Sequence, residues 1–187
     1  MQQHHNNHTI KMFIDNFFVL KHNGGMSLPN FENAQQLAED VISKYSISEP
    51  VVPIYDIAQA EGVIIKIISM PENLKSVSGF IDSENKIIYV NAEDAPNRQT
   101  FTVAHELGHY LLKHDPKKYG VLLRFPEING KEPEEKEANC FAANLLVPQK
   151  MLKETIKKYS LTKEDKSILA QMFGVSKEVM KLRLMRI

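Results

Sequence analysis

His105-Glu106-Leu107-Gly108-His109 is the most informative stretch of this 187-residue sequence. Two histidines four residues apart on a helix lie about 40° apart around its axis and about one turn apart along it. Both imidazoles can therefore reach one zinc ion. Glu106 points aside from this pair, where a carboxylate can act as general base on a water and then pass the proton to a leaving amine. The stretch predicts a catalytic zinc site and leaves the third protein ligand open.

The residues around this motif indicate a buried helix. Pro96 occupies the first-turn position where proline is tolerated, and Pro116 ends a helix expected to run to about His114. Apolar residues flank the histidines, namely Phe101, Ala104, Leu107, Leu111 and Leu112. Glycine inside a helix costs about 1 kcal/mol relative to alanine. Gly108 therefore suggests that something passes close by, and a strand that holds substrate is one candidate.

The pattern outside this helix predicts further helices around a small sheet. Apolar residues recur at helical spacing over 30–42, and a second short helix is expected at 54–62. Three apolar, β-branched segments predict strands at 63–68, 76–82 and 86–91. Residues 116–133 are rich in turn residues, and helices are expected at 134–146, 149–159, 163–173 and 176–187. Helices, a three-stranded sheet and then helices indicate an α+β fold.

Glutamates in the helix expected at 134–146 are the candidates for the third zinc ligand. Helical spacing buries one stripe of this helix, made of Ala138, Phe141, Ala142 and Leu145. Glu134 and Glu137 border that stripe, whereas Glu135 tends outward. Helical geometry alone does not choose between Glu134 and Glu137.

Two segments together resemble the ImmA/IrrE family of metallo-endopeptidases. They are residues 101–114, Phe-Thr-Val-Ala-His-Glu-Leu-Gly-His-Tyr-Leu-Leu-Lys-His, and residues 137–148, Glu-Ala-Asn-Cys-Phe-Ala-Ala-Asn-Leu-Leu-Val-Pro. The resemblance covers residues 30–187 and implies a zincin-like core, similar to thermolysin-like peptidases, with a reduced sheet beside the active helix. It implies a gluzincin-type site in which Glu137 is the third zinc ligand beside His105 and His109, with Glu106 as catalytic base. Known members cleave Xre-type helix-turn-helix repressors and so induce mobile-element, including prophage, or stress genes.

Other side chains near the motif have less specific roles. The oxyanion of a peptidase needs a stabilising group, for which Tyr110, His114 and Tyr119 are available, and the sequence does not choose among them. His114 lies about 140° further round the helix than His109, so a supporting or surface role is expected rather than ligation. Cys140 is expected to be a small buried core residue.

Residues 161–187 resemble a helix-turn-helix, with a break at Gly174 and a cap at Ser176. The basic residues on or beside its second helix would be recognition residues if it bound DNA, and they are Lys177, Lys181, Arg183 and Arg186. A helical hairpin that packs on the catalytic domain or binds the repressor is the favoured interpretation. The chain is thereby divided into a disordered extension at 1–25, a zinc metallopeptidase domain at 26–160 and this C-terminal segment.

Composition excludes several classes of protein. Lys and Arg number 23, as do Asp and Glu, so no net charge steers the chain toward nucleic acid or an anionic membrane. Residues 151–187 alone carry an excess of basic residues. The single cysteine excludes an intramolecular disulfide, and no apolar run approaches the ~20 residues of a membrane span. Without a convincing signal peptide, a cytoplasmic location is expected.

Three functions from different classes are consistent with these patterns. The first is a site-specific zinc endopeptidase acting on an Xre-type repressor. The second is a non-catalytic partner-binding protein of a toxin–antitoxin-like pair, which keeps zinc only as a structural element. The third is a DNA-binding regulator that uses residues 161–187. The intact Glu106 favours the peptidase, because a purely structural zinc site needs no base.

Overall fold

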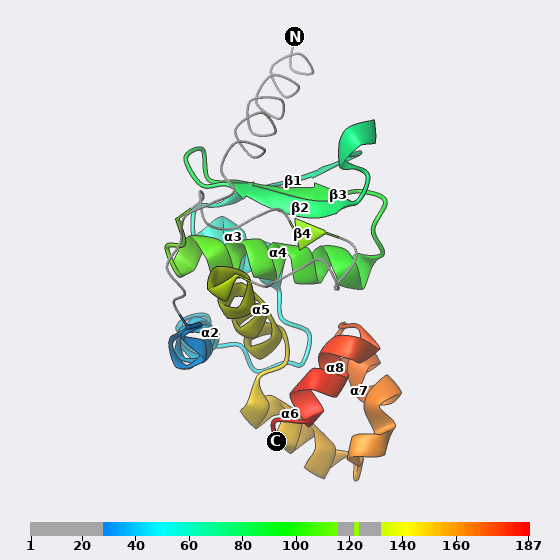
Figure 1. The fold of residues 1–187 in the computed structure, drawn as a ribbon. Helices are drawn as coiled ribbons and strands as arrows, with labels where there is room; N and C mark the ends of the chain where they lie inside the picture. The colour runs from blue at the N-terminus through cyan, green and yellow to red at the C-terminus, as the bar shows by residue number, and fades with distance from the viewer. Residues whose placement is uncertain (1–27, 116–121, 124–131) are drawn as a thin grey trace.

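The structure is a computed structural model, and it describes residues 28–115, 122–123 and 132–187. Helices and a small sheet form a mixed α+β arrangement, as the sequence predicts. The sheet packs on one side of helix α4 (Pro96–Leu111), and helix α5 (Pro133–Leu146) packs on the other (Figure 1). Helix α2 (Phe31–Lys44) covers α5 in turn. The motif helix α4 is thus the middle layer of the molecule.

The sheet has the strand order β1-β3-β2-β4. Strand β1 (Ile64–Ile68) runs parallel to β3 (Ile87–Asn91), and β2 (Val77–Asp82) runs antiparallel to β3. These are the three strands predicted from the sequence. A short fourth strand, β4 (Leu122–Leu123), pairs antiparallel with β2. It lies in the stretch predicted to be loop, because two residues are too few to show strand periodicity.

The helices follow the predicted order, with small differences at their ends. Asn30 caps α2 by accepting a hydrogen bond from the backbone N–H of Asn33 at 3.0 Å. Within the described ranges, the remaining α-helices are α3 (Ile54–Ala60), α6 (Gln149–Lys158), α7 (Lys166–Met172) and α8 (Lys177–Leu184). Two short 3-10 helices occur at η1 (Glu72–Leu74) and η2 (Lys163–Asp165). The helix expected at 163–173 therefore begins as a 3-10 turn before it becomes α7.

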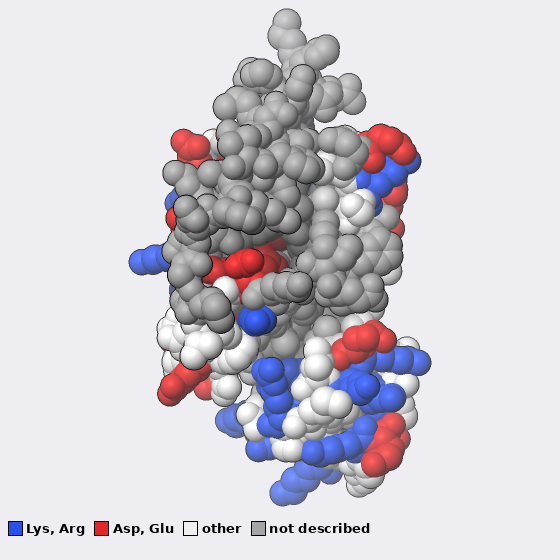
Figure 2. Space-filling model, in the orientation of Figure 1, with Lys and Arg blue, Asp and Glu red and all other residues white. Residues whose placement is uncertain are grey.

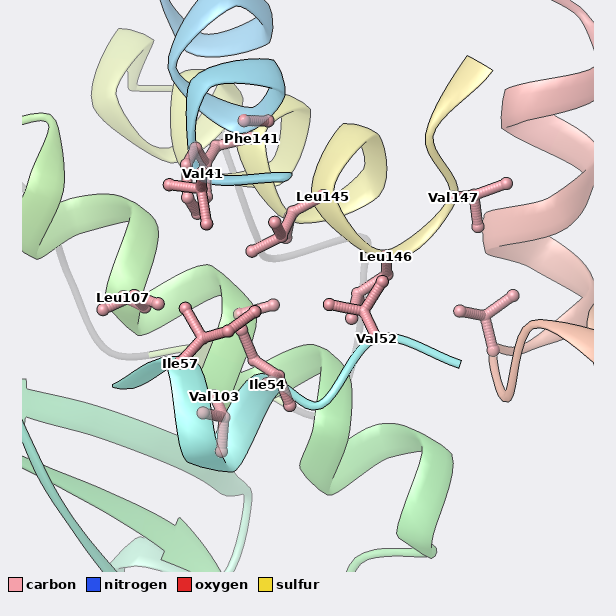
Figure 3. Packing of buried hydrophobic residues seen from close by; sticks show 14 of the residues in the cluster. Val41, Val52, Ile54, Ile57, Val103, Leu107, Phe141, Leu145, Leu146 and Val147 are labelled. Carbon is pink, nitrogen blue, oxygen red and sulfur yellow. The ribbon is translucent and has the colours of Figure 1, made fainter. Parts of the chain in front are cut away.

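The hydrophobic core holds α4 against α3 and α5. Figure 3 shows Val103 and Leu107 of α4 beside Ile54 and Ile57 of α3, with Phe141 and Leu145 of α5 facing them. All six side chains are at most 2% exposed. Burying a side chain of this size stabilises a fold by about 1.5–3 kcal/mol. The orientation of α4 is consequently fixed by its own apolar face.

Gly108 is where α4 and α5 come closest. A Cβ atom at this position would lie 2.8 Å from Cδ1 of Phe141 and 3.4 Å from Cα of Ala138. The expectation that a neighbour passes close by is confirmed, but the suggested substrate-holding strand is wrong. The neighbour is α5, and the close approach brings that helix to the histidines.

The C-terminal segment forms two short helices, α7 and α8, that pack together. Ser176 caps α8 as predicted, accepting from the backbone N–H of Val179 at 3.2 Å. Arg183 does not fit the role of a recognition residue, because it is 3% exposed and its Nε donates to the carbonyl oxygen of Val147 at 2.9 Å. The side chain of Arg183 is directed toward Val147, in the segment between α5 and α6, and not toward solvent. This contact ties α8 to the rest of the chain.

Exposed basic side chains nevertheless gather on the C-terminal helices. Figure 2 shows Lys and Arg concentrated over the region of α6–α8. Lys177, Lys181 and Arg186 are exposed there, in line with the predicted excess of basic residues. The expected extension at 1–25 lies outside the described residues. Among the helices that the structure describes, none is both long enough and apolar enough to cross a membrane.

Candidate metal centre

His105 and His109 come from consecutive turns of α4 and point toward a common position. Both are almost fully buried, at 0% and 1% exposed. Their Nε2 atoms lie 3.0 Å apart. The four-residue spacing thus gives the geometry predicted from the sequence.

Glu135, in the first turn of α5, completes a three-residue cluster with these histidines. Its Oε2 lies 3.4 Å from Nε2 of His105, and its Oε1 lies 3.3 Å from Nε2 of His109. Four ligands placed tetrahedrally at zinc distances of 2.0–2.2 Å are about 3.3–3.6 Å from one another. The observed separations of the three donor groups are close to that spacing. The donor set of two imidazoles and one carboxylate therefore fits a tetrahedral metal ion with a fourth position left for another ligand.

Both histidine rings are held at Nδ1 by other side chains. Nδ1 of His105 lies 3.1 Å from Oδ1 of Asn139, and Nδ1 of His109 lies 2.9 Å from Nδ1 of His114. A hydrogen bond from Nδ1–H leaves the Nε2 lone pair available to a metal. Because Asn139 can accept at its amide oxygen, His105 is oriented as a ligand in this way.

The structure does not bring Glu137, which the resemblance implies as third ligand, into the cluster with His105 and His109. One carboxylate oxygen of Glu137 lies 2.9 Å from Nε2 of His114, and the other accepts from the backbone N–H of Asn30 at 2.7 Å. The reason is that α5 packs against α4 and α2 at once. Glu137 is on the side facing the start of α2, whereas Glu135 is on the side facing α4. Glu134, the other candidate, is outside the cluster as well.

Glu135 is buried, although its position beside the four-residue apolar stripe of α5 predicts that it tends outward. It precedes Ala142 by seven residues, which places the two about 20° apart around the helix. Asn139, four residues after Glu135, is on the same face and contacts His105. A polar pair at this spacing, in line with buried Ala142, is the signal that could have identified both residues. The 5% exposure of Glu135 shows how wide the buried face of α5 is.

Glu106 is the remaining functional residue of the motif, and it is 1% exposed. Within the described part of the chain, neither of its carboxylate oxygens has a well-aligned hydrogen-bond partner. Burial raises the pKa of Glu106 to about 8, although the nearby charge of His105 opposes this shift. A buried carboxyl group without a close partner is costly for stability. Such a group is typical of functional sites, where proton-transfer groups have perturbed pKa values.

Two pKa shifts match the protonation states that a metal requires, and the shift of His105 opposes them. Burial alone would lower the pKa of His105, but its hydrogen bond with Glu135 raises it, which favours the protonated ring. Burial lowers the pKa of His109 to about 3. Burial alone would raise the pKa of Glu135, but hydrogen bonds with His105 and His109 lower it well below its usual value. At neutral pH, His109 is therefore neutral and Glu135 is ionised. Metal ligands bind in these forms.

The other sequence candidates are placed as follows. Tyr110 is half-buried, and Tyr119 lies outside the described residues, so the oxyanion-stabilising group stays unassigned. His114 supports His109 instead of joining the cluster, in line with the role expected for it. Cys140 is 5% exposed and packs in the core, as predicted.

A family model for the IrrE N-terminal-like domain, which describes a family of peptidases, matches residues 60–185. The matched range includes the histidine pair and Glu135. The chain belongs to this family. The IrrE-like assignment confirms the resemblance to the ImmA/IrrE family seen in the sequence.

Two relatives of this IrrE-like chain are radiation response metalloproteases named IrrE. The protein from Deinococcus radiodurans is 31% identical over 101 residues, which cover 52% of this chain and 30% of the relative. The protein from Deinococcus deserti is 33% identical over 101 residues, covering 52% of this chain and 35% of the relative. The match thus spans about a third of the length of each relative.

A solved structure of a Mycobacterium tuberculosis transcriptional regulator has a similar fold. Its TM-score is 0.59 at 14% sequence identity, and the match covers 80% of this chain and 45% of that one. At this level of identity the likeness concerns the fold alone.

Proposed function

We propose that this chain is a zinc-dependent endopeptidase with His105, His109 and Glu135 as zinc ligands and Glu106 as catalytic base. The observation that carries the proposal is the buried, poorly partnered carboxylate of Glu106 beside the three-residue cluster. A structural zinc site needs four closed ligands and no base. Here three donors leave a position open, and a proton acceptor stands next to it. This arrangement supports the gluzincin-type, zincin-like site that the sequence resemblance implies.

Each residue has a distinct task in peptide hydrolysis. Zinc, when bound, polarises the scissile carbonyl and lowers the pKa of water to near neutrality. The positive charge of bound zinc would favour the ionised form of Glu106 over the protonated form that burial favours. In that form Glu106 accepts a proton from the attacking water and delivers it to the nitrogen of the leaving amine. His105, His109 and Glu135 hold the metal, and Asn139 keeps the His105 ring oriented through its Nδ1 contact. The surrounding apolar core excludes water, which strengthens these electrostatic interactions.

We further propose that the substrate is an Xre-type helix-turn-helix repressor whose cleavage induces mobile-element or stress genes. The sequence resemblance to ImmA/IrrE peptidases supports this substrate, and the name of the two Deinococcus relatives supports a role in a stress response. The formal net charge of the chain is zero, so the chain does not attract charged proteins in general. This agrees with a peptidase that acts on a single protein substrate.

The experiment mixes the zinc-loaded full chain with an Xre-type repressor, taken from the neighbouring gene if that gene encodes one. We expect a defined cut that Glu106→Gln abolishes without loss of zinc, because an amide is nearly isosteric with the carboxylate but accepts no proton at neutral pH. General-base catalysis is worth about 10²–10⁴-fold, so fragment formation should fall by at least that range. Glu134→Gln, on an uninvolved residue of α5, serves as the matched control and should cut normally.

Association and fragment formation are scored in the same titration. Normal cleavage by Glu106→Gln would contradict the mechanism. An unaltered biological effect of Glu106→Gln without any fragments would favour the alternative of a non-catalytic, toxin–antitoxin-like partner-binding protein.

A further inference from the structure

A chain of polar contacts leads from His109 away from the metal cluster to the start of α2. Nδ1 of His109 lies 2.9 Å from Nδ1 of His114, and Nε2 of His114 lies 2.9 Å from Oε2 of Glu137. Oε1 of Glu137 accepts from the backbone N–H of Asn30 at 2.7 Å. The side chains of His114 and Glu137 are only 7% and 15% exposed. His114 and Glu137, which are not among the proposed ligands, are therefore largely buried on the side of His109 that faces away from the metal cluster.

The turn at the C-terminal end of α4 places His114 next to His109. Lys113 takes a left-handed conformation, with φ 57°. The backbone N–H of His114 donates to the carbonyl of His109 at 3.1 Å, and that of Lys113 donates to the carbonyl of Tyr110 at 3.2 Å. This pair of bonds is the Schellman motif, which brings the residue after the left-handed position back over the last turn of the helix. In most such motifs an apolar contact forms there, whereas here two imidazoles meet.

The protons along these contacts can be assigned from the partners. An ionised Glu137 can only accept, so Nε2 of His114 carries the proton in the 2.9 Å contact. In a neutral His114 the other ring nitrogen is then an acceptor. Nδ1 of His109 must therefore be the donor, which leaves the lone pair of His109 at Nε2. That lone pair is directed toward Glu135 and the proposed metal.

We infer that His114 and Glu137 form a positioning pair that fixes the tautomer and orientation of His109 as a metal ligand. The inference rests on the proposed metal site and deepens it. Glu137 acts through His114 and does not bind the metal. It also joins the site to the N-terminal end of α2, because one carboxylate satisfies the His114 ring and the backbone N–H of Asn30 together.

Glu137→Gln tests the pair directly. Both carboxylate oxygens face N–H donors, and glutamine has only one carbonyl oxygen. If its NH₂ group faces His114, the His114 ring must accept at Nε2 and donate at Nδ1. That arrangement removes the acceptor that His109 requires. Loss of outer hydrogen-bond partners typically costs about 10–100-fold in metal affinity.

The experiment measures the zinc dissociation constant of the full chain by competition with a chelator. Glu137→Gln and His114→Ala should each weaken binding about 10–100-fold. The double variant should be no weaker than the worse single variant, because both changes break one chain of contacts. Glu134→Gln, which removes the same charge from the same helix, should match the parent. Thermal unfolding of the metal-free variants separates lost affinity from lost folding.

Cobalt substitution shows whether the ligand set is retained. The visible spectrum of the Co²⁺ form should keep its shape in Glu137→Gln and change in Glu135→Gln. Parent-like zinc affinity in Glu137→Gln, additive losses in the double variant, or a spectrum altered as in Glu135→Gln would each overturn the positioning role. If Glu135→Gln and His105→Ala also retained full zinc affinity, the proposed metal site itself would fail.

Discussion

Glu135 is the residue on which the proposed zinc site depends most, because it is the one member of the cluster that α5 contributes. We expect Glu135→Gln to lose the stoichiometric zinc that the parent retains, since two imidazoles hold zinc poorly and a neutral amide is a weak ligand. Metal content is measured by elemental analysis after equilibration with a chelating buffer, which removes ions from weak sites such as His4, His5 and His8.

Two matched variants control this measurement. Glu134→Gln should retain one zinc per chain, because Glu134 lies outside the cluster. His105→Ala should lose it, like Glu135→Gln. Full zinc content in Glu135→Gln together with loss in Glu134→Gln would show that the wrong glutamate of α5 has been assigned.

At the residue scale, the sequence predicted the parts of the site that depend on one helix. The spacing of His105 and His109 specifies their relative position whatever packs around them, so the pair was predictable. The choice of Glu135 over Glu137 depends on how α5 is rotated between α4 and α2. That rotation results from packing of both faces, which a stripe of four apolar residues does not define. Glu137, the ligand that the resemblance implies, lies one contact further out, with its carboxylate 2.9 Å from Nε2 of His114.

Among the elements, the contact between α4 and α5 matters most for the site, and Gly108 lies at its centre. We expect Gly108→Ala to lower stability by about 1–2 kcal/mol, although alanine favours helix by about 1 kcal/mol. The reason is that the added methyl group would lie 2.8 Å from the ring of Phe141, which is fully buried and cannot move aside. Chemical denaturation measures the change, and the separation of the helices should also weaken zinc binding.

The double variant Gly108→Ala, Phe141→Leu identifies the cause of this loss. Because leucine removes the ring atoms nearest to the new methyl group, the double variant should lose less stability than the sum of the two single variants. Strict additivity, or a Gly108→Ala protein as stable as the parent, would show that α5 tolerates the extra group.

Element types were predictable from periodicity, whereas element contacts were not. The strands at β1, β2 and β3 are β-branched and bounded by turn residues, and the helices carry apolar stripes with caps such as Asn30 and Ser176. Strand β4 has only two residues and shows no period. The burial of Arg183 was missed because its partner, the carbonyl of Val147, is 36 residues away in sequence.

At the scale of the whole molecule, the proposed zinc ion would link α4 to α5, because its ligands come from both of these central helices. A metal that binds only the folded protein stabilises it by about 2.7 kcal/mol when its free concentration is 100 times the dissociation constant. For a chain of this size the corresponding rise in melting temperature is roughly 5–11 °C. We expect zinc to produce such a rise in the full chain and a chelator to reverse it.

Variants at the motif separate this effect from adventitious binding. Glu106→Gln should keep the zinc-dependent rise, because Glu106 handles protons and is not a ligand. His105→Ala should lose it, while any zinc bound by surface histidines would remain and would affect both variants equally. An equal rise in His105→Ala and the parent would therefore mean that zinc stabilises the chain from elsewhere. A rise confined to proteins with the intact His105, His109 and Glu135 cluster means that folding and metal binding are coupled at this site.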